Sequence, residues 1–259
     1  MELTAYQVFR FLHITAGGLA AFLVFPMAFF SIKGSQFHKR TGYLAIFLSV
    51  LVAIAGISML LNPSFPSLWA RNIAQRGVEW VLFFNALMYE RIFFVWLIIA
   101  LLYFCFSAVR VWTRINSVNK GGPSYGAIDI ALTSLIIISS SYLLFVGCWD
   151  IYHLSFHPFA LFFIEISLYL IFFGLVDIAT FIAPSKYLVK WGFILHGYKF
   201  FSAWDALLTA FIIRLRINYS TLETLDTIYS LLMHTLILVA LWKYIFTKRL
   251  RGLVHASKR

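Results

Sequence analysis

The stretch that decides the fold is Tyr6–Leu61, which reads YQVFRFLHITAGGLAAFLVFPMAFFSI (residues 6–32), KGSQFHKRTG (residues 33–42) and YLAIFLSVLVAIAGISMLL (residues 43–61). An α-helix needs about 20 mostly apolar residues to cross a bilayer. The two apolar segments each reach that length, and a short basic turn joins them. This stretch therefore predicts a hairpin of two transmembrane helices.

The composition of the whole chain extends this prediction. The 259 residues are 62% hydrophobic and only 12% charged, whereas a soluble domain has about 25% charged residues. The net charge is +11, and the charged residues lie between the apolar segments. This distribution favours contact with anionic lipid headgroups in a bilayer over nucleic-acid binding.

Seven apolar segments of the chain predict an all-α membrane protein, a helical bundle with about seven transmembrane helices in a single domain, residues 1–259. The sixth segment is the shortest and the most polar, because it contains Lys199 and Asp205. A further apolar stretch, residues 77–90, is too close to the third segment to cross separately, and is predicted to be an interfacial helix. The predicted spans are approximately residues 6–32, 42–61, 92–112, 128–148, 158–183, 198–213 and 228–246.

The lysines and arginines predict the orientation. With the N-terminus outside, 15 of the 21 Lys and Arg residues fall in the inner turns or the C-terminal tail. Positive residues are enriched on the cytoplasmic side of membrane proteins. The bias, together with an odd number of spans, predicts an N-out, C-in topology.

Four histidines fall at two matched depths in this topology. His13 and His234 lie inside the outer boundary of the first and seventh spans, while His38 and His196 lie at the inner boundary, at the starts of the second and sixth. Imidazole is a common axial ligand of haem iron. The depths therefore predict two bis-histidine haem b sites, one formed by each pair, if the first, second, sixth and seventh spans are neighbours.

Two glycines support the haem interpretation. Gly17 follows His13, and Gly42 follows His38, by four residues. This spacing places a backbone without a side chain next to the histidine on one helix face, where a flat macrocycle can approach. The same spacing also lets two helices pack closely, and a histidine at the lipid boundary can instead meet a phosphate or hydrogen-bond a neighbouring helix. His153 and His157, in the outer loop, are either solvated or the edge of a metal or quinone site.

Intramembrane carboxylates form a second set of candidates. Glu165 and Asp177 lie on the fifth predicted span and Asp205 on the sixth. A carboxylate in an apolar environment must be paired or protonated, and the partners considered are Lys199, Arg214 and Arg10. The acids form either a proton or ion path or structural hydrogen bonds between helices, and their different depths favour the structural interpretation.

The two ends of the chain also resemble a known family. His13…Gly17, the run Phe37-His38-Lys39-Arg40-Thr41-Gly42-Tyr43, and the segment from Leu195-His196 to Arg214 carry the likeness. This pattern is similar to that of uncharacterised bacterial predicted membrane proteins of unknown function. The paired histidines alone also resemble those of cytochrome b561-like bundles. This sequence departs from the family at Tyr43, where arginine is usual. The resemblance implies the bacterial cytoplasmic (inner) membrane and a histidine-bearing bundle, and it implies no reaction.

Three functions follow as hypotheses. The first is a haem b electron-transfer module or a subunit of a membrane redox complex, with a quinone or partner subunits as its redox partners. The second is a proton-coupled carrier or channel that uses the three carboxylates. The third is a non-catalytic accessory subunit or a pigment-binding scaffold of a larger assembly. No nucleotide-binding, hydrolase or zinc-protease motif occurs in the sequence, so we assign no catalytic residue.

Overall fold

We describe the protein from a computed structural model, which describes residues 4–32, 34–62, 80–153 and 158–218. Within these ranges the chain forms helices, turns and connecting loops, without a β-strand. The chain divides into two compact units, Met1–Ala210 and Phe211–Arg259. The packing and the sites below belong to the first unit.

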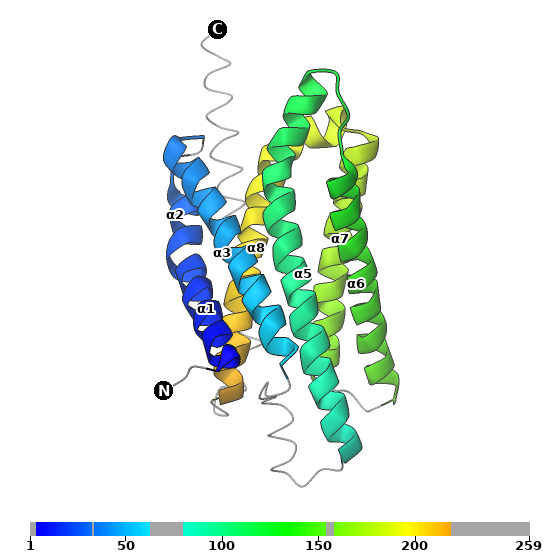
Figure 1. Ribbon diagram of the computed structural model, residues 1–259. Helices are drawn as coiled ribbons and strands as arrows, with labels where there is room; N and C mark the ends of the chain where they lie inside the picture. The colour runs from blue at the N-terminus through cyan, green and yellow to red at the C-terminus, as the bar shows by residue number, and fades with distance from the viewer. Residues whose placement is uncertain (1–3, 33, 63–79, 154–157, 219–259) are drawn as a thin grey trace. The chain divides into compact units, whose positions relative to one another are not determined.

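The elements follow one another as a series of long helices. They are α1 (Ala5–Leu19), the π-helical turn η1 (Ala20–Val24), α2 (Phe25–Phe30), α3 (Gln36–Leu60), α5 (Trp80–Asn119), α6 (Ala127–His153), α7 (Pro158–Ile182), the π-helical turn η2 (Ser185–Val189) and α8 (Lys190–Asn218). Figure 1 shows α1, η1 and α2 as one continuous helix beside α3.

Among the described residues, five helical segments are long and apolar enough to cross a membrane: Ala5–Phe30, Gln36–Leu60, Arg91–Asn119, Ala127–Trp149 and Phe163–Ile182. They coincide with the first five predicted spans. The sixth predicted span, residues 198–213, lies within α8, which is not among the five. The seventh, residues 228–246, lies outside the described residues, so the number of seven and the orientation stay predictions.

The start and the interruption of the first span have local causes. Thr4 caps α1, because the Gln7 amide donates to its hydroxyl and its own amide donates to the Gln7 side chain. Pro26 has no amide hydrogen and its ring displaces the carbonyl one turn before it. The π-helical turn η1 ends at Val24, two residues before this proline. A π-helical turn is one of the features at which helices bend.

The structure joins the segment predicted as an interfacial helix, residues 77–90, to the third span, and its place at the membrane interface stays a prediction. From Trp80 onward these residues form the first turns of α5, a single 40-residue helix that continues through the third span to Asn119. No glycine or proline occurs between Trp80 and Asn119, so nothing in the sequence breaks the helix between the two segments. Residues 77–79 lie outside the described residues.

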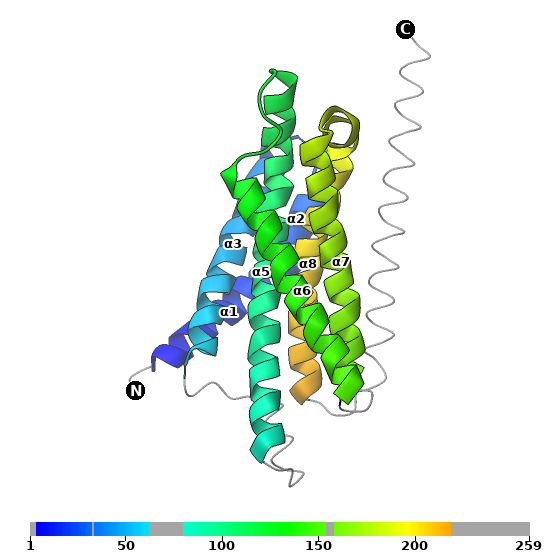
Figure 2. The ribbon, with the colours of Figure 1, turned by 90° about the vertical axis from the view of Figure 1, so that its right-hand side faces the viewer.

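The helices pack as two antiparallel hairpins with α5 between them. The first hairpin is α1–α2 against α3, the second is α6 against α7, and α5 contacts both α3 and α6 (Figures 1 and 2). Residues 190–210 of α8 join the hairpins, since Phe200 packs on Phe25 with ring centroids 4.8 Å apart and Lys199 contacts Asp177. The predicted proximity of the first, second and sixth spans is therefore observed.

The contact between α6 and α7 depends on a glycine. A Cβ atom placed on Gly147 would lie 2.9 Å from the carbonyl oxygen of Ala160 and 3.0 Å from Ile164. Because the first of these is a backbone atom, the helices must separate to admit a methyl group. We expect Gly147→Ala to lower the free energy of unfolding by about 1–3 kcal/mol, measured by thermal or denaturant unfolding in detergent.

Gly18 supplies the matched control for this prediction. It also lies within a helix, and a Cβ atom placed on it would meet nothing within 4 Å. Gly18→Ala should leave stability unchanged or raise it by up to about 1 kcal/mol, because alanine has the higher helix propensity. Equal destabilisation by the two changes would contradict the close α6–α7 contact.

Candidate functional site

The structure brings His38 and His196 together. Their ring centroids are 6.1 Å apart and the ring planes are inclined by 79°. His38 lies in the first turn of α3, and His196 lies in the second turn of α8. The two residues are 158 positions apart in sequence, so the fold of the first unit creates this pair.

Both rings are oriented by a backbone carbonyl. Nδ1 of His38 lies 2.9 Å from the carbonyl oxygen of Ala28, and Nδ1 of His196 lies 2.9 Å from that of Ala108. The Ser31 hydroxyl donates to the same Ala28 carbonyl, so its oxygen can also accept from His38 at 3.0 Å. Because a carbonyl oxygen only accepts, Nδ1 carries the hydrogen and Nε2 of the neutral ring carries the lone pair. Metal-ligating histidines are usually fixed in this way.

The surroundings of the pair are aromatic on one side and open on another. The ring centroid of Trp112 lies 5.8 Å from that of His196, and the Phe200 ring stacks on His196 at 6.3 Å. Gly42, one turn beyond His38, has no atom within 4 Å of where a Cβ would be. Both histidines are half-buried. The site therefore lies at an apolar boundary of the bundle.

His13 also lies within hydrogen-bond distance of a backbone carbonyl, in the second half of α3. Its Nδ1 lies 3.0 Å from the carbonyl oxygen of Val52, and its ring packs where a Cβ on Gly56 would be, at 3.3 Å. Gly17, the predicted companion of His13, packs against Val52 instead. The predicted partner His234 lies outside the described residues, so the outer pair stays a prediction. His153 is the last residue of α6, and His157 also lies outside the described residues.

A second cluster lies between α5, α7 and α8, around Asp177. The ammonium of Lys199 lies 2.5 and 2.6 Å from the two Asp177 oxygens, and the Tyr103 hydroxyl donates to one of them at 2.6 Å. Their exposed fractions are only 2% for Asp177, 0% for Lys199 and 1% for Tyr103. Lys199 was one of the partners considered from the sequence, and the structure confirms that pairing.

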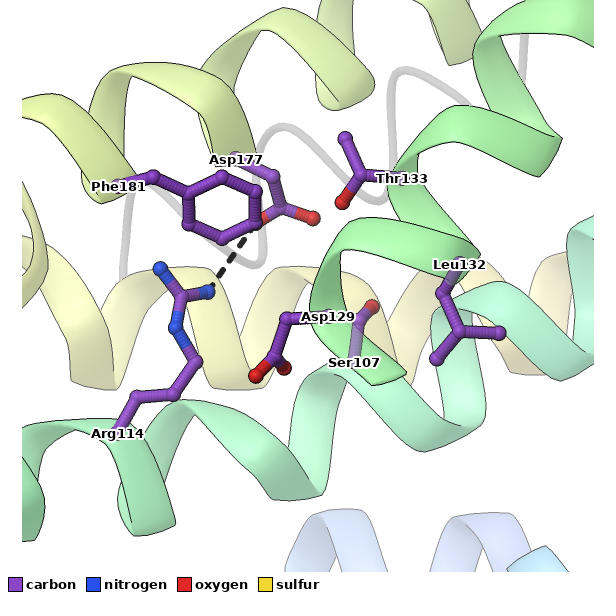
Figure 3. A pocket seen from close by; sticks show the side chains of 7 residues that line it. All are labelled: Ser107, Arg114, Asp129, Leu132, Thr133, Asp177 and Phe181. Atoms are coloured by element: carbon purple, nitrogen blue, oxygen red, sulfur yellow. Dashed lines mark ion pairs between the residues drawn. The ribbon is translucent and has the colours of Figure 1, made fainter. Parts of the chain in front are cut away.

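Arg114 extends this cluster toward the loop after α5. Its guanidinium lies 3.7 Å from Asp177 and donates to the Thr180 hydroxyl and to the Ser124 carbonyl. The aromatic ring of Phe181 covers it, with 4.5 Å between the guanidinium carbon and the ring centroid. Figure 3 shows Arg114 directed at Asp177 between α5 and α7. The charged groups of three helices are thus tied together in the protein interior.

Asp129 forms a separate pair beside this cluster. Both of its oxygens accept from Arg110 at 2.6 Å, and one also accepts from the Gly126 amide. Asp129, Asp177, Arg114, Ser107 and Thr133 line one pocket (Figure 3), which admits no water-sized sphere. The hydroxyl of Ser107 is buried there without a hydrogen-bond partner. The side chains around the pocket therefore leave no room for a water molecule.

The three carboxylates predicted from the sequence do not form one group. Asp177 is buried, Glu165 is exposed on α7, and Asp205 is partly exposed on α8. Sequence reasoning missed Tyr103, Arg114 and Asp129 as members of the buried clusters. Arg114 is counted among the inner-turn cations of the predicted topology, because it follows the predicted end of the third span at residue 112. The available signal was the lack of a glycine or proline between that position and Asn119, which lets the helix continue past Arg114.

The ligand set at the histidine pair is small. Among the described residues no group of three or more His, Cys, Asp and Glu side chains could hold a metal ion. A haem iron takes four of its ligands from the macrocycle and needs only one or two from the protein. The His38–His196 pair supplies two.

Comparison with known proteins adds no assignment to this geometry. No family model matches the chain, and neither the curated proteins nor the solved structures yield a match.

Proposed function

We propose that the protein is a membrane electron-transfer protein that holds haem b between His38 and His196. The observation that carries the proposal is the pair itself, with both Nδ1 atoms bound to backbone carbonyls. His38 and His196, whose ring centroids lie 6.1 Å apart, would hold the haem iron through their Nε2 atoms.

The residues around the pair have distinct roles in this proposal. The carbonyls of Ala28 and Ala108 hold the two rings in the tautomer that presents Nε2 to the metal. Trp112 and Phe200 form an apolar wall beside His196 and exclude water. Gly42 leaves the backbone of α3 open next to His38. The bound haem would supply one-electron oxidation and reduction.

The remaining parts of the proposal come from the sequence. His13 and His234 form the second, outer haem site, and electrons pass to a quinone or a partner subunit in the same bilayer. The charge bias supports the N-out, C-in topology, and the family resemblance supports the bacterial inner membrane. The end of the bundle with His38 and His196 then faces the cytoplasm.

A proton-coupled carrier receives less support than the haem site. It requires Glu165, Asp177 and Asp205 to line one path, but these residues differ in burial and only Asp177 lies in a buried charged cluster. In the accessory-subunit alternative, replacement of the histidines leaves the function of the assembly unchanged. In the pigment-scaffold alternative, the same histidines hold a chlorin instead of haem.

Extraction of the detergent-purified protein tests the proposal against these alternatives. We expect acidic acetone to release a non-covalently bound haem b, together with an amount of iron close to that of the haem. A magnesium-containing chlorin in the extract would favour the pigment scaffold. A colourless extract without iron would contradict the proposed function.

A further inference from the structure

We propose that Lys199 is a proton-binding site coupled to the histidine pair, such that the Lys199 amine gains a proton when the site gains an electron. This inference rests on the proposed function. It concerns only the groups of this chain that face Asp177: Tyr103 and Arg114 on α5 and Lys199 on α8.

The charges around Asp177 are unequal. Lys199 and Arg114 both face this one carboxylate, and both are buried, with exposed fractions of 0% and 3%. The neighbouring Asp129 lines the same pocket, but both of its oxygens are engaged by Arg110. Among the described residues, the site around Asp177 therefore holds one positive charge too many when every group is ionised. A net charge in an apolar interior is costly, so the site is balanced when one cation lacks its proton.

Lys199 is the cation that can give up its proton. Arginine stays protonated in proteins, whereas a buried lysine readily changes its protonation state. Lys199 keeps its contacts in either state, because an amine and an ammonium can both donate two hydrogen bonds to Asp177. Tyr103 donates to the same carboxylate, and Arg114 stays in place to balance it. The exchanged proton is thus assigned to the Lys199 nitrogen.

The position of Lys199 on α8 connects it to the histidine pair. Lys199 follows His196 by three residues on α8, and side chains with this spacing lie on neighbouring parts of one helix surface, with Cβ atoms about 5–6 Å apart. A unit charge added about 10 Å away in a protein interior changes a proton-binding constant by tenfold or more. Reduction of the histidine site therefore favours the protonated form of Lys199.

The coupled step balances in charge and atoms. One electron arrives from a one-electron donor, and one proton moves from water to the Lys199 amine, which becomes an ammonium ion. On oxidation both leave. Because reduction takes up a proton, the midpoint potential of the site falls as the pH rises.

Redox titration of the purified protein at several pH values tests the inference. Absorbance is recorded during titration with dithionite, and proton uptake is followed with a pH dye in weak buffer. For the wild type we expect a midpoint potential that falls with pH, and an uptake that approaches one proton per electron within part of the range. Lys199→Met and Lys199→Arg should both give a potential that is independent of pH over that range, since neither side chain can exchange the proton.

Lys190→Met is the matched control, because Lys190 is exposed at the start of the same helix. It should keep the pH dependence of the wild type. A wild-type potential that does not change with pH, or a pH dependence that survives in Lys199→Met, would overturn the inference and leave the haem proposal intact. Absence of a haem spectrum in the wild type would overturn both.

Discussion

Replacement of His196 by alanine is expected to reduce the haem-to-protein ratio to half or less of the wild-type value. The change removes one of the two proposed iron ligands, and loss of even an indirect ligand contact weakens a metal site by about 10- to 100-fold. If the outer pair holds a second haem, half of the haem remains; otherwise almost none does. The ratio is measured from the Soret absorbance and the protein concentration after purification in detergent.

His38→Ala should give the same loss, since His38 is the other proposed ligand and its ring centroid lies 6.1 Å from that of His196. Lys39→Ala is the matched control, because Lys39 is the next residue of α3 and is exposed. It should retain the full haem content. Haem retention by both histidine variants would exclude this pair as the ligands.

Asp177→Ala is expected to have the largest effect on stability. The change removes the carboxylate that faces Lys199 and Arg114, and takes a hydrogen-bond acceptor from Tyr103. Removing one partner of a buried ion pair costs about 3–5 kcal/mol. We expect a loss of this size in the free energy of unfolding, measured by denaturant titration in detergent.

Two further variants identify the cause of that loss. Glu165→Ala removes an exposed carboxylate from the same helix and should change stability by less than about 1 kcal/mol. In the double variant Asp177→Ala/Lys199→Met, the lysine is no longer left without its acceptor, and we expect recovery of about 1–2 kcal/mol relative to Asp177→Ala alone. Equal losses in Asp177→Ala and Glu165→Ala would contradict the buried cluster.

The helices of this protein could be predicted from the sequence because the bilayer imposes their length. Five apolar segments of about 20 residues were recognised, and the structure has helices of suitable length at each. Length could not separate residues 77–90 from the third span, however. Whether a helix bends between two apolar segments depends on glycine and proline, and their absence between Trp80 and Asn119 leaves α5 continuous.

The histidine pair and the charged cluster differ in how far the sequence could predict them. Depth along the helices was enough to match His38 with His196, because both lie near the starts of two helices, α3 and α8, that run in the same direction. The partners of Asp177 depend on the rotation of each helix about its axis, which depth does not determine. Lys199 could be named only as one of three candidates, and Tyr103 has no property in the sequence that distinguishes it from the other twelve tyrosines.

The most direct test of the central claim is the reduced-minus-oxidised visible spectrum of the purified wild-type protein. The account predicts the sharp Soret and α bands of a low-spin haem with two histidine ligands. A flat difference spectrum from a folded, monodisperse preparation expressed with an adequate haem supply would contradict it.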